Sequence, residues 1–159
     1  MNAQTYEPIV LTVVINAPAE RVFRALTDPE QRVAWWGVEG KFRATHMESD
    51  LRPGGAWRMR GTAQGKPFTL SGEYRAVERP RLLEFTWVDD HMQDAPPTLV
   101  RFDLEEKQGA TTVRLTHSGF TSEHARNRYQ GWPWLLALLR GHAERRSPAE
   151  GRADTAAHS

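Results

Sequence analysis

Hydrophobic and polar positions divide the chain into an early strand, two short helices, a run of alternating strands and a C-terminal helix. Residues 9–16, IVLTVVIN, are rich in β-branched side chains and predict a largely buried strand. From residue 41 to residue 117, apolar and polar positions alternate between turns such as RPGG, RP and QGA. This pattern predicts antiparallel strands that each bury one face.

Two short helices are predicted directly after the first strand. Asn16 can cap the first helix, Pro18 suits its first turn, and an apolar stripe follows. Asp28, followed by a proline, repeats this signal and predicts a second short helix over residues 30–36 that stops at Gly37.

The C-terminal helix is predicted over residues 121–144, with Thr121 or Ser122 as its cap. Pro133 cannot donate a helical hydrogen bond, so the helix should kink or divide near Gly131. Because the strands follow one another and the helices stand apart from them, the order predicts an α+β fold. One strand, residues 41–50, has an unclear register.

Length and composition predict one globular domain. The chain has 159 residues, and residues 8–143 carry the apolar periodicity, whereas the polar segments 1–7 and 144–159 read as flexible tails. With 21 basic and 20 acidic residues, the net charge of +1 gives no electrostatic support for nucleic-acid binding. The sequence shows no cysteine, signal peptide or membrane-spanning run, which predicts a cytoplasmic protein; homodimerisation stays open.

Two titratable residues share the apolar faces of their strands. His117 is either a general base or ligand-orienting group, or a strand-end histidine whose ring bonds the backbone of the following turn. Tyr74 either donates its hydroxyl to a ligand or packs with that hydroxyl satisfied inside the protein. These two residues are the candidate acid and base of any enzymatic activity.

Bulky side chains dominate the predicted inner face, and they either fill the core or line a cavity. The expected ligand-binding residues are Trp35, Trp36, Trp57, Met59, Phe68, Tyr74, Phe85, Trp87, Phe102, Leu115, His117, Trp132 and Leu135. Trp35 and Trp36 cannot face the same way, because adjacent helical residues point about 100° apart. We expect one of them in the core or the cavity wall and the other, assigned as Trp36, across the rim against the C-terminal helix.

No metal site or cofactor is predicted. The six histidines show no paired ligand spacing and thiolates are absent, while the glycines match no phosphate-binding pattern. A GxSxG nucleophile motif is also missing.

Five motifs in succession resemble a known superfamily. They are APAERVFRALTDPEQRVAWWG, DLRPGGAWRMR, GEYRAVERPRLLEFTW, TTVRLTHSGF, and GW followed by a leucine-rich helix. In this order they resemble the START-related helix-grip superfamily (SRPBCC), in the branch of the C-terminal domain of the activator of heat shock protein 90 ATPase. The resemblance covers about residues 8–143.

The resemblance implies a curved antiparallel sheet of six to seven strands wrapped round a long C-terminal helix. In relatives, the space between them holds lipids, hormones, polyketides or other apolar molecules. The leading functional prediction is therefore binding of a small hydrophobic or aromatic ligand. The alternatives are an enzyme of the cyclase, dehydratase or hydrolase kind, and a module that activates a chaperone ATPase. The chain has no room for the additional N-terminal chaperone-binding domain of the eukaryotic activators, so a chaperone partner is the less favoured alternative.

Overall fold

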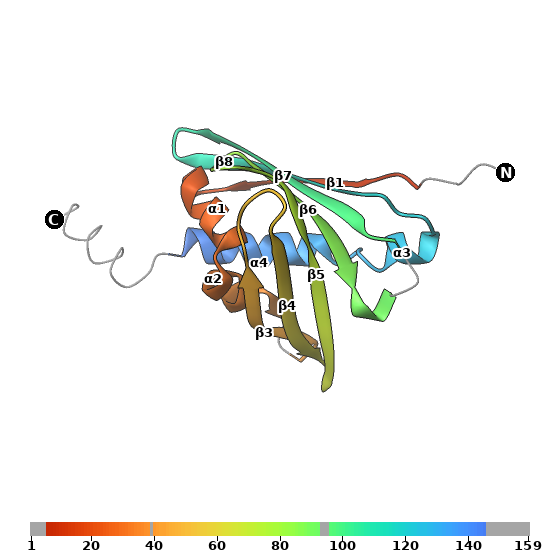
Figure 1. Cartoon of the computed structure of the whole chain (residues 1–159). Helices are drawn as coiled ribbons and strands as arrows, with labels where there is room; N and C mark the ends of the chain where they lie inside the picture. The colour runs from red at the N-terminus through yellow and green to blue at the C-terminus, as the bar shows by residue number, and fades with distance from the viewer. Residues whose placement is uncertain (1–5, 39, 93–95, 146–159) are drawn as a thin grey trace.

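The computed structural model describes residues 6–38, 40–92 and 96–145 of the chain (Figure 1). Its elements are, in chain order, β1 (Ile9–Ile15), α1 (Ala19–Thr27), α2 (Pro29–Trp35), β2 (Gly37–Val38), β3 (Phe42–Ser49), β4 (Ala56–Ala63), β5 (Lys66–Glu78), β6 (Leu82–Asp89), the 3-10 turn η1 (Asp90–Met92), β7 (Thr98–Lys107), β8 (Ala110–Ser118), α3 (Glu123–Asn127) and α4 (Trp132–Glu144).

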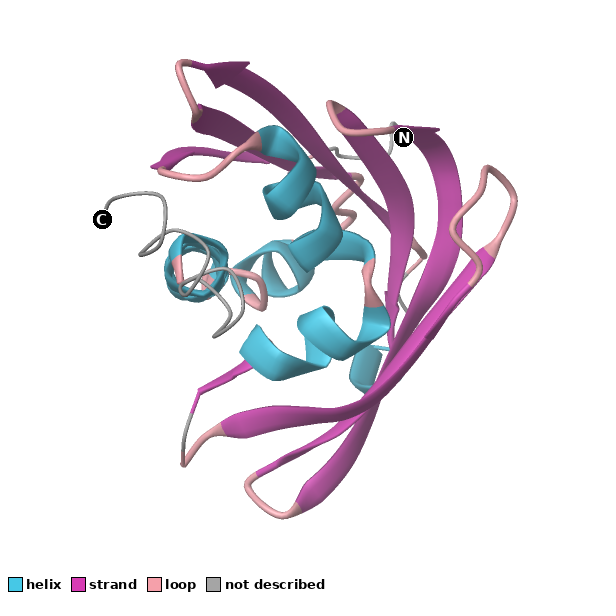
Figure 2. Ribbon diagram, turned by 90° about the vertical axis from the view of Figure 1, so that its left-hand side faces the viewer, coloured by secondary structure: helices cyan, strands magenta, loops and turns pink. Residues whose placement is uncertain are grey.

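The strands form one antiparallel sheet in the order β1-β8-β7-β6-β5-β4-β3-β2. Figure 2 shows this sheet curving around the helices, which all lie on its concave side. The predicted α+β helix-grip architecture is therefore confirmed. Seven strands have ordinary lengths, and the two-residue strand β2 extends the edge beside β3.

A β-bulge explains the unclear register of the third strand. Ala44 pairs with Gly61 and His46 with Arg60, so Thr45 is an extra residue with no directly opposed partner. As a result Ala44 and Met47 are both buried although they are three positions apart. The alternation of the sequence is broken here because the backbone itself changes phase.

The start of α1 differs from the prediction. Pro18, and not Asn16, is the N-cap residue, and no side chain of the cap bonds to the first turn. Instead the Ala19 N–H donates to Glu106 Oε1 of β7 at 2.7 Å. A carboxylate from a distant strand thus satisfies an orphan donor and suits the positive end of the helix. The second helix, α2, ends at Trp35, one residue earlier than predicted.

The C-terminal helical region is divided, as predicted, into α3 and α4. Ser122 caps α3 by accepting a hydrogen bond from the Ala125 N–H at 3.0 Å. Pro133 lies in the first turn of α4, where its missing N–H costs little. Trp132 therefore opens a new helix that runs along the concave face of the sheet (Figure 1).

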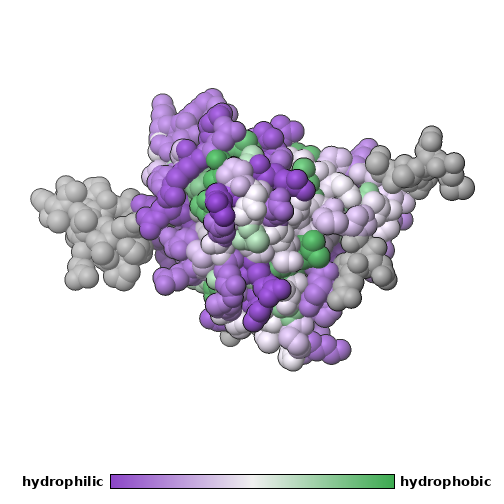
Figure 3. Space-filling model, viewed as in Figure 1, coloured by the Kyte–Doolittle hydropathy of each residue, from purple (hydrophilic) through white to green (hydrophobic). Residues whose placement is uncertain are grey.

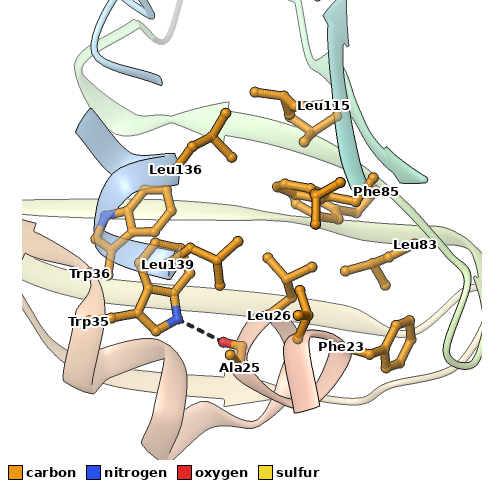
Figure 4. Packing of buried hydrophobic residues seen from close by; sticks show 14 of the residues in the cluster. Phe23, Ala25, Leu26, Trp35, Trp36, Leu83, Phe85, Leu115, Leu136 and Leu139 are labelled. Carbon is orange, nitrogen blue, oxygen red and sulfur yellow. Dashed lines mark hydrogen bonds between the residues drawn. The ribbon is translucent and has the colours of Figure 1, made fainter. Parts of the chain in front are cut away.

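The core lies where α1, α2 and α4 meet the sheet. Figure 4 shows Leu26 of α1 and Leu136 and Leu139 of α4 directed toward Phe85 on β6, and each of these side chains is at least 95% buried. The outer surface contrasts with this interior: on the face in Figure 3, hydrophilic residues predominate and the hydrophobic ones form small, separated patches.

Candidate ligand-binding site

An aromatic cluster centred on Trp87 of β6 covers the concave face of the sheet. The centroid of its ring lies 5.4 Å from that of Trp57, 5.6 Å from Trp36 and 5.8 Å from Trp132. Tilted and edge-to-face contacts at these distances are favourable beyond simple burial. The cluster joins the residue that follows α2 to β4, β6 and the start of α4.

Beside this cluster, a cleft of about 370 Å³ opens between the sheet and the start of α4. Its apolar walls come from both sides: Trp36, Phe42, Ala63, Phe68, Leu70 and Trp87 from α2 and the sheet, and Trp132, Trp134 and Leu135 from α4. Lys41, Gln64, Asp89, Arg128, Tyr129 and Gly131 complete the lining. The site is a largely apolar cleft with a few polar groups, the usual composition of a small-molecule pocket.

One end of the cleft is fixed by an ion pair. Arg128 Nε, from the segment between α3 and α4, donates to Asp89 Oδ2 at 2.9 Å, while Asp89 Oδ1 accepts from the His91 N–H, also at 2.9 Å. Nearby, burial and the Asp89 charge raise the pKa of Tyr129 to about 12. Tyr129 is therefore a neutral phenol at the wall of the cleft.

His117 lies behind the cleft and is fully buried. The Trp132 indole N–H donates to His117 Nδ1 at 2.9 Å, so the proton of the neutral ring is on Nε2, which donates to Thr98 Oγ1 at 2.7 Å. Thr98 in turn donates to the Trp87 carbonyl at 3.4 Å. The chain of hydrogen bonds connects α4 to β8, β7 and β6.

These contacts favour the structural interpretation of His117. Burial lowers its pKa to about 3, and both ring nitrogens are bonded to side chains. The ring is thus neutral and saturated, with no lone pair left to take a proton from a ligand. The structural interpretation had expected the ring to bond the backbone of the following turn. Its partners are instead the side chains of Thr98 and Trp132.

Tyr74 also has an internal partner. Its side chain is 2% exposed, and its hydroxyl lies 2.6 Å from Ser49 Oγ across the sheet. Burial raises the pKa of this phenol. The hydroxyl is satisfied within the protein.

The tryptophan pair at the end of α2 is buried on both sides. Trp35 donates its indole N–H to the Ala25 carbonyl at 2.8 Å and so ties α2 to α1 (Figure 4). Trp36 lines the cleft and meets Trp132 of α4 at 6.1 Å, edge to face. Trp36 therefore contacts the C-terminal helix, as expected, and is also part of the cavity wall.

The structure separates the expected ligand-binding residues into two groups. Those that line the cleft are Trp36, Phe68, Trp87, Trp132 and Leu135. Those that pack in the core outside its lining are Trp35, Trp57, Met59, Tyr74, Phe85, Phe102, Leu115 and His117.

Several lining residues were not anticipated from the sequence. Lys41 and Gln64 lie in turns, and Arg128 lies between α3 and α4. Asp89 ends β6 and is a charged residue on the buried face of that strand, in phase with Trp87. Trp134 is 58% exposed, on a different side of α4 from the buried Trp132 and Leu136. A tryptophan on the side of a helix opposite to its apolar stripe is a sequence signal that could have pointed to Trp134 as a lining residue.

Within the described part of the chain, no group of three or more His, Asp or Glu side chains is arranged to hold a metal ion. The described helices are also too short or too polar to span a bilayer.

A curved antiparallel sheet that holds helices on its concave side, with a cleft beside the C-terminal one, defines a protein of the helix-grip class. The chain belongs to the family described as Activator of Hsp90 ATPase homolog 1-like protein, whose model matches residues 16–144. No curated protein matches the chain.

Solved structures agree with this assignment. A protein from Chromobacterium violaceum is 28% identical, with a TM-score of 0.78 over 89% of this chain and 100% of that one. CalU16 from Micromonospora echinospora is also 28% identical, with a TM-score of 0.64 over 91% of this chain and 79% of its own. An AHSA1-like protein from Aeromonas hydrophila, 23% identical, shares the fold with a TM-score of 0.69, covering 86% and 92% of the two chains.

Proposed function

We propose that the protein binds a small hydrophobic or aromatic molecule in the cleft between its sheet and the start of α4. The observation that carries the proposal is the cleft itself: about 370 Å³ with walls that are mainly indole, phenyl and aliphatic groups. Ligand pockets commonly enclose roughly 300–1,000 Å³ and have this composition. Apolar surface that is excluded from water on binding supplies the driving force.

The enzymatic alternative receives less support. It required His117 and Tyr74 to act as acid and base across a shared cavity. His117 has both nitrogens engaged, the Tyr74 hydroxyl is bonded to Ser49, and neither residue lines the cleft. Binding without chemistry is therefore the function that fits the geometry best.

The test is a thermal-unfolding screen with fatty acids, flavonoids and polyketide-like aromatic compounds. A ligand present at 100 times its dissociation constant stabilises the folded state by about 2.7 kcal/mol, which raises Tm by several degrees. We expect at least one compound class to do so.

Two matched variants locate the binding. Ala63→Phe places a ring in the cleft and should abolish the ligand-induced rise in Tm, because Ala63 is part of the lining. Ala137→Phe makes the same change on the exposed side of α4 and should leave the rise intact. Absence of any shift across the panel, or an equal loss in both variants, would overturn the proposal.

A further inference from the structure

We propose that the ligand is an amphipathic organic acid, whose single anionic group pairs with Lys41 at the mouth of the cleft while its apolar body lies against the tryptophans inside. The inference rests on the proposed binding function and adds the chemical class of the ligand. It is carried by the distribution of charge around the cleft.

The charges at the inner end of the cleft neutralise each other. Asp89 is the acidic residue of the lining, and its carboxylate is 7% exposed. It is bonded to Arg128 through one oxygen and to the His91 N–H through the other. A ligand cation would meet a carboxylate whose charge is already balanced by the Arg128 guanidinium, with each of its oxygens accepting a hydrogen bond.

Lys41 is the remaining charge of the lining, and among the described residues no carboxylate forms an ion pair with it. Its backbone is held at the rim, because the Gln64 N–H of the β4–β5 turn donates to the Lys41 carbonyl at 3.0 Å. The cleft thus carries a net positive charge at a fixed place on its rim.

The ammonium group of Lys41 reaches across the mouth. Its Nζ lies 4.3 Å from the centre of the Trp134 ring, on the opposite wall. A cation over an indole face is attracted to it, and this contact holds the amine beside the opening. The same contact covers that indole face, so the exposed aromatic ring is unavailable as a receptor for a ligand cation.

An anion at this position has two advantages. It meets an ammonium group that is paired with no carboxylate of the described residues, and its apolar body can enter between Trp36 and Trp132 without burying a charge. A neutral ligand would gain only the second of these. The cleft therefore favours an acid over its uncharged analogue.

The experiment compares two fluorescent probes with the same ring system. 1-Anilinonaphthalene-8-sulfonate carries one negative charge, and N-phenyl-1-naphthylamine is neutral. For the wild-type protein we expect tighter binding of the anionic probe. Raising the ionic strength from about 0.01 M to about 1 M, which shortens the screening length from about 30 Å to about 3 Å, should weaken the binding of that probe alone.

Variants assign the effect to Lys41. Lys41→Met should weaken binding of the anionic probe about threefold to tenfold and leave the neutral one unchanged, while Lys41→Arg should retain most of the preference. Lys107→Met removes a lysine that is far from the cleft and pairs with Glu105, and it should behave as wild type. If both probes bind but Lys41→Met does not distinguish them, the inference is wrong and the binding function survives. If neither probe binds, the inference is wrong as well, and the thermal-unfolding panel alone decides the binding function.

Discussion

The guanidinium carbon of Arg32 lies 4.5 Å from the centre of the Trp36 ring, and the Arg32 side chain is almost completely buried. Nη1 donates to the Leu26 carbonyl at 3.0 Å, but Nε has no hydrogen-bond partner among the described residues. Among the described residues, aromatic rings surround the cation and no carboxylate pairs with it. Burial lowers the pKa of Arg32 to about 10.

This arrangement predicts that the volume of Arg32 stabilises the fold more than its charge does. Arg32→Met keeps an unbranched apolar side chain and removes a desolvated charge, so it should cost less than about 1.5 kcal/mol. Arg32→Ala leaves a cavity beside Trp36 and should cost about 2–4 kcal/mol. Chemical denaturation of the variants measures both values. Equal destabilisation by Met and Ala would show that the charge, and not the packing, is what matters.

The buried His117 predicts a pH-dependent stability. Its pKa is about 3 in the folded protein and near 6.5 when exposed, so between these values the unfolded state binds more protons. The stabilisation due to the neutral ring is complete above about pH 6.5 and is lost progressively as the pH falls toward 3, by an amount of the order of 5 kcal/mol. Urea unfolding at a series of pH values measures it.

Two variants isolate the histidine from other groups, including His142, whose pKa burial also lowers. His117→Gln should cost about 1–3 kcal/mol at neutral pH, and the difference from wild type should shrink as the pH falls. Thr98→Val removes a hydrogen-bond partner but keeps the ring, so its pH dependence should follow the wild type. A pH-independent effect of His117→Gln would contradict the assignment.

Two glycines should respond oppositely to alanine. At Gly72, a Cβ would lie 1.8 Å from the Thr86 carbonyl oxygen and 2.6 Å from Trp57 Nε1, so Gly72→Ala should force β5 and β6 apart and cost more than about 3 kcal/mol. At Gly141, in α4, a Cβ would meet open space, and alanine should add about 0.5–1 kcal/mol of stability. Thermal unfolding of both variants is the measurement, and a neutral Gly72→Ala would refute the close approach.

Loss of the Asp89–Arg128 ion pair at the inner end of the cleft should destabilise the protein more than loss of the exposed Asp103–Arg101 pair. Asp89→Ala leaves Arg128 without its partner next to apolar walls and should cost about 2–4 kcal/mol. Asp103→Ala breaks a pair in which both side chains are over 40% exposed, and should cost less than about 1 kcal/mol. Comparable losses in the two variants would show that the Asp89 pair is solvated like a surface one.

Much of the fold was predictable because periodicity reports directly on burial. The alternation that puts Val113, Leu115 and His117 on one face holds in the structure, and the division before Trp132 follows from proline chemistry. The bulge at Thr45 and the capping of α1 by Glu106 were not predictable, because each depends on a partner strand that sequence order does not specify.

The site was predictable only in its apolar part. Bulky side chains identify an inner face, but the same pattern marks Phe85, which fills the core, and Phe68, which lines the cleft. The difference arises from how closely α4 approaches each point of the sheet. Lys41 and Trp134 come together from a turn and a helix 93 positions apart, a distance over which no local pattern carries information.

The placement of the tryptophans has an optical consequence. The chain contains six tryptophans, and four of them, Trp36, Trp87, Trp132 and Trp134, line the cleft. A molecule that enters this space displaces water from, or stacks against, most of the fluorophores of the protein at once. The intrinsic emission of the unlabelled chain is therefore a built-in reporter of whether the cleft is filled.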